Sequence, residues 1–146
     1  MTLHLIKLAV GVDDLAHLEA LQAQRLRLAR TQGTARLLHL TRHAPRRQAE
    51  LLAGGSVYWV IRGMIRVRQR LLGFETVGDG DRRRCALVLD PALAATVARP
   101  QRAFQGWRYL RHEDAPADAE PDPAAGDGAD EMPPTMVAEL RQLGLL

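Results

Sequence analysis

The charge of this 146-residue chain is divided so unevenly that its two parts are not expected to fold alike. Residues 1–112 hold 19 of the 20 basic residues and 8 of the 17 acidic ones, a net charge of +11. Residues 113–146 hold one basic residue and nine acidic ones, a net charge of −8. A basic body followed by an acidic tail favours a body that meets polyanions and a tail that competes with them.

The tail is predicted to consist of a linker and a helix. Residues 113–131 contain eight acidic residues, no basic residue and no apolar periodicity, so they are predicted to be a flexible acidic linker. Residues 132–146 are predicted to form a helix with an apolar stripe made of Met136, Val137, Leu140 and Leu143. We expect this helix to dock on the body, and the linker to be autoinhibitory by competing with anionic ligands.

The apolar pattern of residues 1–112 predicts one basic α+β domain. Strands are predicted at residues 3–10, 37–42, 56–62, 64–74, 83–89 and within 103–110. Helices are predicted at about 13–30 and at 46–53, and a loop at 90–100, with a helical turn at 92–97 as the alternative. Regular βαβ alternation stops after residue 55. The pattern therefore favours a small mixed, partly closed β-barrel with two inserted helices and a C-terminal helix over a dinucleotide fold.

Two of these elements also carry predictions about which residues face the core. Alternation in the first strand places one mostly apolar set inward, namely His4, Ile6, Leu8 and Val10. In the first helix, one apolar arc is formed by Leu15, Leu18, Leu21, Leu26 and Leu28.

Arginine gathers on one predicted strand. Arg66, Arg68 and Arg70 alternate with apolar residues and therefore share a strand face, which Arg62 and Arg84 are placed to flank. Three cations at this spacing repel one another unless they are exposed, paired with acids or bound to an anion. A surface that tracks phosphates explains them, and the alternative is a solvated strand face with nearby acidic counter-charges.

Aromatic residues lie beside several of these arginines. Trp107, Arg108 and Tyr109 are consecutive, and Tyr58 and Trp59 precede Arg62. Aromatic rings next to guanidinium groups are typical of sites that hold single-stranded RNA or flipped bases. The alternative is that Trp59, Trp107 and Phe104 pack in the core.

Chemistry beyond anion binding has weaker support in the sequence. Lys7, Tyr58 and Trp59 are candidates for a closed pocket, but no catalytic residue is identified. His39 and His43 have no third ligand at a convincing spacing, so no metal site is predicted, and no cofactor motif is found. Cys85 alternates with apolar strand residues and is predicted to be a buried structural thiol.

The sequence also bears on location. No apolar run approaches the ~20 residues that a membrane helix needs. The first ten residues are too short and too polar for a signal peptide. A cytoplasmic protein is therefore expected.

Three motifs carry a resemblance to known proteins. GGSVYWVIRG at residues 54–63, RRCALVLDP at 83–91 and RAFQGWRYL at 102–110 closely resemble an alphaproteobacterial family known only as a domain of unknown function. Residues 49–70, a short helix followed by a glycine turn and an arginine-bearing hairpin, look more distantly like the core of PUA-like and ASCH-like barrels. That second resemblance implies an RNA-binding module or, as in some ASCH-like proteins, hydrolysis of modified nucleosides.

Together these observations predict a cytoplasmic PUA-like module that binds RNA or a nucleotide-like ligand on an arginine and aromatic face. The alternatives are an enzyme acting on a modified nucleobase or other small molecule, and a protein-interaction domain. The oligomeric state is left open. The predicted nucleic-acid-binding residues are Arg62, Arg66, Arg68, Arg70, Arg84, Trp107, Arg108 and Tyr109.

Overall fold

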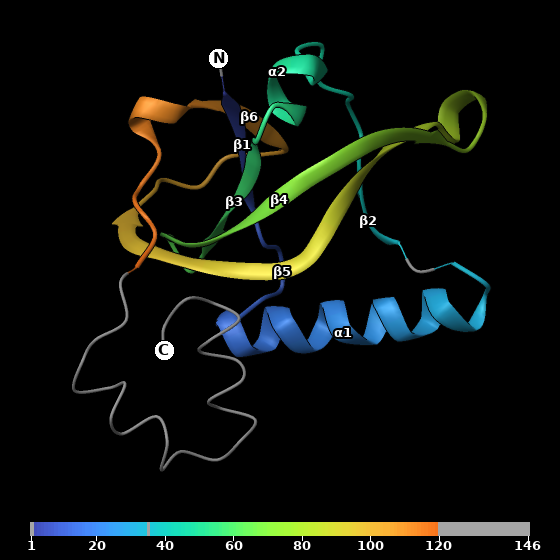
Figure 1. Cartoon of the computed structure of the whole chain (residues 1–146), viewed down its shortest axis with the longest axis horizontal. Coiled ribbons are helices and arrows are strands. Elements are labelled where there is room, and N and C mark those ends of the chain that lie inside the picture. The colour runs from blue at the N-terminus through green and yellow to red at the C-terminus, as the bar shows by residue number, and fades with distance from the viewer. Residues whose placement is uncertain (1, 35, 120–146) are drawn as a thin grey trace.

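The structure is a computed structural model that describes residues 2–34 and 36–119 (Figure 1). The predicted C-terminal helix and residues 120–131 of the predicted linker lie outside the described residues. No helix within the described ranges is long and apolar enough to cross a membrane.

Within the described residues, two helices and one six-stranded sheet form a mixed α+β architecture, as predicted. The helices are α1 (Leu15–Thr31) and α2 (Gln48–Leu52). The strands are β1 (Leu3–Leu8), β2 (Leu37–Thr41), β3 (Ser56–Ile61), β4 (Met64–Val77), β5 (Arg84–Pro100) and β6 (Trp107–Arg111). Their order across the sheet is β2-β5-β4-β3-β1-β6, and only the β1–β3 pair is parallel. Short 3-10 turns occur at Gly80–Arg82 and His112–Asp114.

The loop predicted at residues 90–100 is wrong, because β5 runs through it to Pro100. The register explains why the proline did not end the strand. Gln69 of β4 pairs with Leu93 of β5, and Leu71 of β4 pairs with Leu89 of β5. Two residues of β4 therefore correspond to four residues of β5 at this point. Pro91 lies in that irregularity, where its missing N–H removes no regular ladder bond. The strand therefore tolerates Pro91, although a proline usually ends a strand.

Both faces of the sheet are buried near its centre. A first apolar cluster, on the side that α1 covers, includes Leu5, Leu18 and Trp59. A second cluster on the opposite face includes Ile6 and Tyr58. The predicted one-sided pattern of the first strand is therefore wrong: residues 3–6 are all buried, and Val10 lies beyond β1 with 85% of its surface exposed.

The buried face of α1 is partly polar. Its helix starts as predicted, with the Asp14 carboxylate accepting a hydrogen bond from the His17 backbone N–H at 2.7 Å. Leu28, predicted in the apolar arc, is 60% exposed, whereas Gln22 is buried. The reason is a polar partner beneath the helix, the fully buried Gln69 of β4.

Gln69 satisfies every polar position of its side-chain amide. Its oxygen accepts hydrogen bonds from Gln22 Nε2 at 3.0 Å and from Trp59 Nε1 at 3.1 Å. Its nitrogen donates to Gln22 Oε1 and to the Asp90 carbonyl, each at 2.8 Å. Two donated and two accepted bonds are the capacity of a primary amide. One side chain therefore links α1, β3, β4 and β5.

Side chains, rather than strand pairing, connect the two edges of the sheet. Trp107 Nε1 on β6 donates to the carbonyl of His43, just after β2, at 2.7 Å. The Tyr109 hydroxyl accepts from the backbone N–H groups of Arg46 and Arg47 at 2.9 and 3.2 Å. Within the described residues no ladder joins β2 to β6, so the sheet is open, and the predicted partly closed barrel is not established.

Gly55 should be difficult to replace, because there is no room for a side chain beside it. A Cβ on this residue would overlap the backbone carbonyls of Leu3 and Leu51, whereas a Cβ on Gly73 would meet Val88 at an ordinary 3.8 Å. We expect Gly55→Ala to lower the free energy of unfolding by about 2–3 kcal/mol. Gly73→Ala should change it by about 0.5 kcal/mol or less. Urea denaturation measures both, and equal costs would contradict this account of the packing.

Removing the Gln69 amide should be more costly than its size suggests. Gln69→Leu leaves the Trp59 N–H, the Gln22 amide and the Asp90 carbonyl without their partner, so we expect a loss of about 3 kcal/mol of stability. Gln22→Leu should cost less, because Gln69 keeps two of its bonds. Gln105→Leu, at an exposed position, is the control. A Gln69→Leu protein as stable as the control would show that the network contributes nothing.

Candidate functional site

The predicted arginine and aromatic residues do not form one surface. Across the sheet, Arg68 lies opposite Tyr58, Tyr58 opposite Ile6, and Ile6 opposite Arg108. Residues directly opposite on neighbouring strands share a face, so this row lies on the face of the second cluster, away from α1. The middle arginine of the predicted ladder and Arg108 are thus on the same side.

Trp107 and Tyr109 lie on the other side of the sheet. Their partners on β1 are Lys7 and Leu5, and Lys7 is in turn opposite Trp59. The predicted arginine and aromatic face is therefore split between the two faces of the sheet. So is the predicted pocket of Lys7, Tyr58 and Trp59, because only Tyr58 faces away from α1.

Each side chain of that predicted pocket is held by its surroundings. Trp59 is 1% exposed and donates to Gln69, which supports the packing alternative for this residue. Lys7 is half-buried, and burial lowers its pKa. Burial raises the pKa of Tyr58, which is 4% exposed. These three residues therefore do not converge on one cavity.

The strict alternation predicted for residues 64–74 fails at Arg66. Both ladders of β4 shift register around this residue, and Ile65 packs in the second cluster while Val67 packs in the first. Arg66 is the extra residue of this bulge, and its side chain is exposed. Arg70, opposite Ser56, is also exposed. The predicted ladder is therefore reduced to Arg68 and Arg70.

Arg62 and Arg84 lie near opposite ends of β4, whose 14 residues span roughly 40 Å. Arg62 has a φ of 50° in the turn between β3 and β4 and pairs with Asp13 at 3.2 Å. Arg84 donates to the carbonyls of Asp81 and Arg83. Neither residue joins Arg68.

Arg68 does lie in a cavity, of about 400 Å³, which is lined by His4, Gly54, Tyr58, His112 and residues 115–118. Its guanidinium holds the Asp118 carboxylate with two bonds, Nε to Oδ1 at 2.6 Å and Nη2 to Oδ2 at 2.7 Å. A third bond runs from Nη1 to the buried Ser56 hydroxyl at 3.2 Å. The hydrogen bonds between them raise the pKa of Arg68 and lower that of Asp118, so both stay charged. We call this cavity the Arg68 pocket.

Two histidines of the pocket form a directed pair. His4 Nδ1 accepts a hydrogen bond from the backbone N–H of Ser56 at 3.0 Å, so that nitrogen carries no proton. Neutral His4 is therefore protonated on Nε2, which donates to His112 Nδ1 at 2.9 Å. His112 then holds its own proton on Nε2. Burial, with the nearby His112 and Arg68, lowers the pKa of His4 to about 4 and keeps it neutral.

The polar groups of the Arg68 pocket are mainly hydrogen-bond donors. Apart from the Asp118 carboxylate, they are the Arg68 guanidinium, the remaining N–H of His112 and the hydroxyl of Tyr58, which stays protonated because burial raises its pKa. Donors around a fixed cation suit an anion, and a carboxylate occupies the pocket now. The arrangement can therefore bind a carboxylate or a phosphate.

Sequence reasoning missed several residues of this pocket, and it misplaced the start of the tail. Residues 117–119, which lie in the segment predicted as flexible linker, pair with β5. Val97 N–H donates to the Ala117 carbonyl at 2.8 Å, and Ala119 N–H donates to the Ala95 carbonyl at 2.9 Å. Thr96 and Asp118 form a bridge between these bonds. The composition of the segment concealed this, because the contacts use its backbone and one acid. The missed pocket residues are His4, His112 and Asp118, and Ser56, which bonds to Arg68 and His4, was missed as well.

The other singled-out residues have structural surroundings. The His39 ring meets Trp59 edge-on with centroids 4.9 Å apart, and burial, with Lys7 and Arg25 nearby, lowers the pKa of His39 to about 4. Cys85 is buried, as predicted, and burial raises its pKa. Among the described residues, no group of three or more His, Cys, Asp or Glu side chains is placed to hold a metal ion.

Comparison with known proteins identifies the family of this chain. A family model described as "Protein of unknown function (DUF1489)" matches residues 5–146. No curated protein and no solved structure matches the chain.

The two histidines with lowered pKa values, His4 and His39, should make the protein less stable in mild acid. Both have a pKa of about 4 in the fold against 6.5 in the unfolded chain, so the unfolded state binds more protons between these values. Stability should therefore fall as the pH drops from about 6.5 to 4, by on the order of 2–3 kcal/mol for each imidazole.

His4→Asn isolates the contribution of the pocket, because an asparagine carbonyl can still accept from the Ser56 N–H but does not titrate. We expect it to flatten the stability profile between pH 6.5 and 4. His43→Asn, at an exposed side chain, is the control and should leave the profile unchanged. Urea midpoints measured across this range give the answer, and an unchanged slope in His4→Asn would contradict a neutral, buried His4.

Proposed function

Since this chain belongs to the DUF1489 family, whose function is unknown, we propose from its own residues that it binds phosphate groups of RNA, or of a nucleotide-like ligand, at the Arg68 pocket. The observation that carries the proposal is the two-bond capture of the Asp118 carboxylate by Arg68. A planar guanidinium presents the same pair of N–H groups to carboxylate and phosphate oxygens. A phosphate in the place of this carboxylate would use donors that are already oriented.

Further arginines on the same face support a ligand with several phosphates. Arg70 is opposite Ser56, Arg99 opposite Ile65 and Arg108 opposite Ile6, which places all three on the side of the second cluster. The Arg108 guanidinium lies 4.8 Å from the centre of the Phe104 ring, which orients it. Arg99 was hidden in the predicted loop. Phosphates spaced along a strand would meet these cations in turn.

The same geometry favours recognition of the backbone over recognition of bases. Tyr58 is nearly covered, and Trp107 and Tyr109 lie on the α1 side of the sheet, so none of these rings is available for stacking beside Arg68. Affinity would come from charge neutralisation, which is salt-dependent and insensitive to sequence. The proposal includes a PUA-like relationship, because modules of that kind often bind RNA. It also includes a cytoplasmic site of action.

Asp118 gives the acidic segment a defined role in the proposal. Its carboxylate occupies the donors that a phosphate would use, so a ligand has to displace it. The bridge of residues 117–119 to β5 holds this competitor beside the pocket. In this proposal, the autoinhibition predicted from the sequence depends on the single ion pair between Arg68 and Asp118.

A labelled single-stranded oligoribonucleotide titrated over a salt series tests the proposal. Arg68→Ala with Arg70→Ala should weaken binding and lower the slope of log K against log salt by about 1.4, that is 0.7 for each lost phosphate contact. Asp118→Asn should strengthen binding at low salt, because it removes the competing charge, and the gain should fade as salt rises.

Arg62→Ala is the matched control, because it removes an arginine that lies away from the Arg68 pocket and pairs with Asp13. Its salt slope should equal that of the unaltered protein. The exposed Arg70→Ala alone should still lower the slope by about 0.7, which separates loss of binding from any misfolding of the half-buried Arg68 variant. Unchanged slopes in both single and double variants would overturn the proposal.

A further inference from the structure

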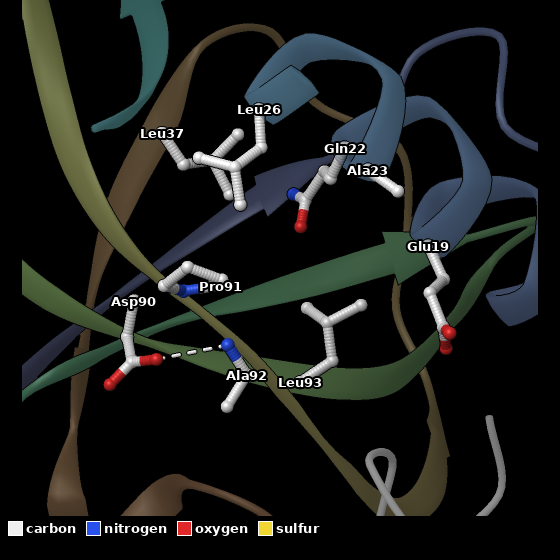
Figure 2. Close-up of a pocket in the computed structure, with 9 residues that line it drawn as sticks. All are labelled: Glu19, Gln22, Ala23, Leu26, Leu37, Asp90, Pro91, Ala92 and Leu93. Atoms are coloured by element: carbon white, nitrogen blue, oxygen red, sulfur yellow. Dashed lines mark hydrogen bonds between the residues drawn. The ribbon is translucent and has the colours of Figure 1, made fainter. Parts of the chain in front are cut away.

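A second cavity lies on the opposite face of the sheet, between α1 and β5. It measures about 490 Å³ (Figure 2). Gln22 forms part of its lining together with the Asp90 segment, and Glu19 lies at one end of it in the view of Figure 2. Its apolar walls are formed by Ala23, Leu26, Leu37, Pro91, Ala92 and Leu93. We call it the α1–β5 groove.

We propose that the α1–β5 groove is the docking site of residues 135–146 of this same chain. The sequence places an apolar stripe in that segment at helical spacing, formed by Met136, Val137, Leu140 and Leu143. An amphipathic helix laid in an apolar groove is a common mode of recognition, read as anchors one turn apart. This inference is independent of phosphate binding at the Arg68 pocket, which lies on the other face.

The direction of the chain leads to the groove. Ala117 is bonded to Val97 and Ala119 to Ala95, so the chain runs antiparallel to β5 towards lower residue numbers. The next residue on the same face of β5 is Leu93, which lines the groove. Ala119 already packs against the apolar cluster on the α1 side. The last described residues therefore point at the groove from its nearer end.

Residues 120–134, between the last described residue and the proposed docking segment, are long enough to reach the groove. Residues 120–134 could span roughly 50 Å when extended, whereas two residues along β5 cover about 7 Å. Residues 135–146 can therefore reach the groove in either orientation. The family match extends to residue 146, so this segment belongs to the matched pattern.

Charge on α1 favours one of the two orientations, in which the connection passes the groove before residues 135–146 turn back into it. The acids between the last described residue and the stripe are Glu120, Asp122, Asp127, Asp130 and Glu131, with no basic residue among them. Arg27 and Arg30 are exposed on α1, each four residues after a groove residue, Ala23 and Leu26. They therefore continue the groove side of the helix by one turn. An acidic connection crossing that turn would meet two cations.

Disulfide trapping in the full chain tests the docking. Cys85 is buried and is replaced by Ala to remove the native thiol. Ala23→Cys on the groove wall is combined with Leu143→Cys, and the control pair combines the exposed Gln24→Cys with Leu143→Cys. Under mild oxidation, we expect at least tenfold more intramolecular disulfide in the Ala23 pair than in the Gln24 pair, measured by mass spectrometry of the monomer.

A second measurement does not depend on disulfide formation. Leu140→Asp should lower the urea midpoint of the full chain, while Gln142→Asp, on the opposite side of the stripe, should leave it unchanged. Equal trapping of the two cysteine pairs, with equal midpoints for Leu140→Asp and Gln142→Asp, would overturn the proposal. A disulfide found only between two chains would overturn it as well, because the occupant would then be a second copy.

Discussion

The amide of Gln69 is the interaction on which the arrangement of this domain depends. A strand buried on both sides has to place each residue on one face or the other, and a polar side chain is expelled unless all its groups are bonded. Gln69 remains inside because Gln22, Trp59 and the Asp90 carbonyl supply four partners. With Gln69 held inward, its neighbours Arg68 and Arg70 are turned to the opposite face. The position of the anion-binding cation is therefore a consequence of the polar core.

Irregularities in the β4–β5 pairing shape the rest of the sheet. Register shifts occur at Arg66 and opposite Pro91, and Figure 1 shows β4 and β5 as one long, bent hairpin. Bulges bend strands and increase their twist. On the α1 side, the edge strand β2 and the segment after it reach across the sheet: His39 meets Trp59 of β3, and the carbonyl of His43 meets Trp107 of the other edge strand, β6. The register shifts between β4 and β5 thus determine both the contacts across the sheet and the face on which each aromatic ring lies.

The sequence predicts the positions of helices and strands well, but it predicts poorly which face of the sheet each residue occupies. Strand and helix positions follow from local periodicity, so β1 to β4 and both helices were found. Which face a residue occupies depends on bulges, and a single extra residue such as Arg66 reverses the alternation. The pairing of His4 with His112 spans 108 positions, and no local pattern encodes it. Asp118 was misjudged because composition predicts the average behaviour of a segment, whereas one ion pair and two backbone bonds hold this part of it.

The exposure of the Arg68–Asp118 pair determines what kind of ligand can displace it. Half of the Asp118 side chain and a third of the Arg68 side chain are accessible, so solvent screens the pair and its contribution to stability is about 1 kcal/mol or less. A single carboxylate or phosphate from solution gains little over this tethered competitor, whose effective concentration at the pocket is high. A strand of phosphates that also meets Arg70, Arg99 and Arg108 gains several contacts for the loss of one. If the pocket binds phosphate groups as proposed, the tethered acid favours ligands with several phosphates over isolated anions.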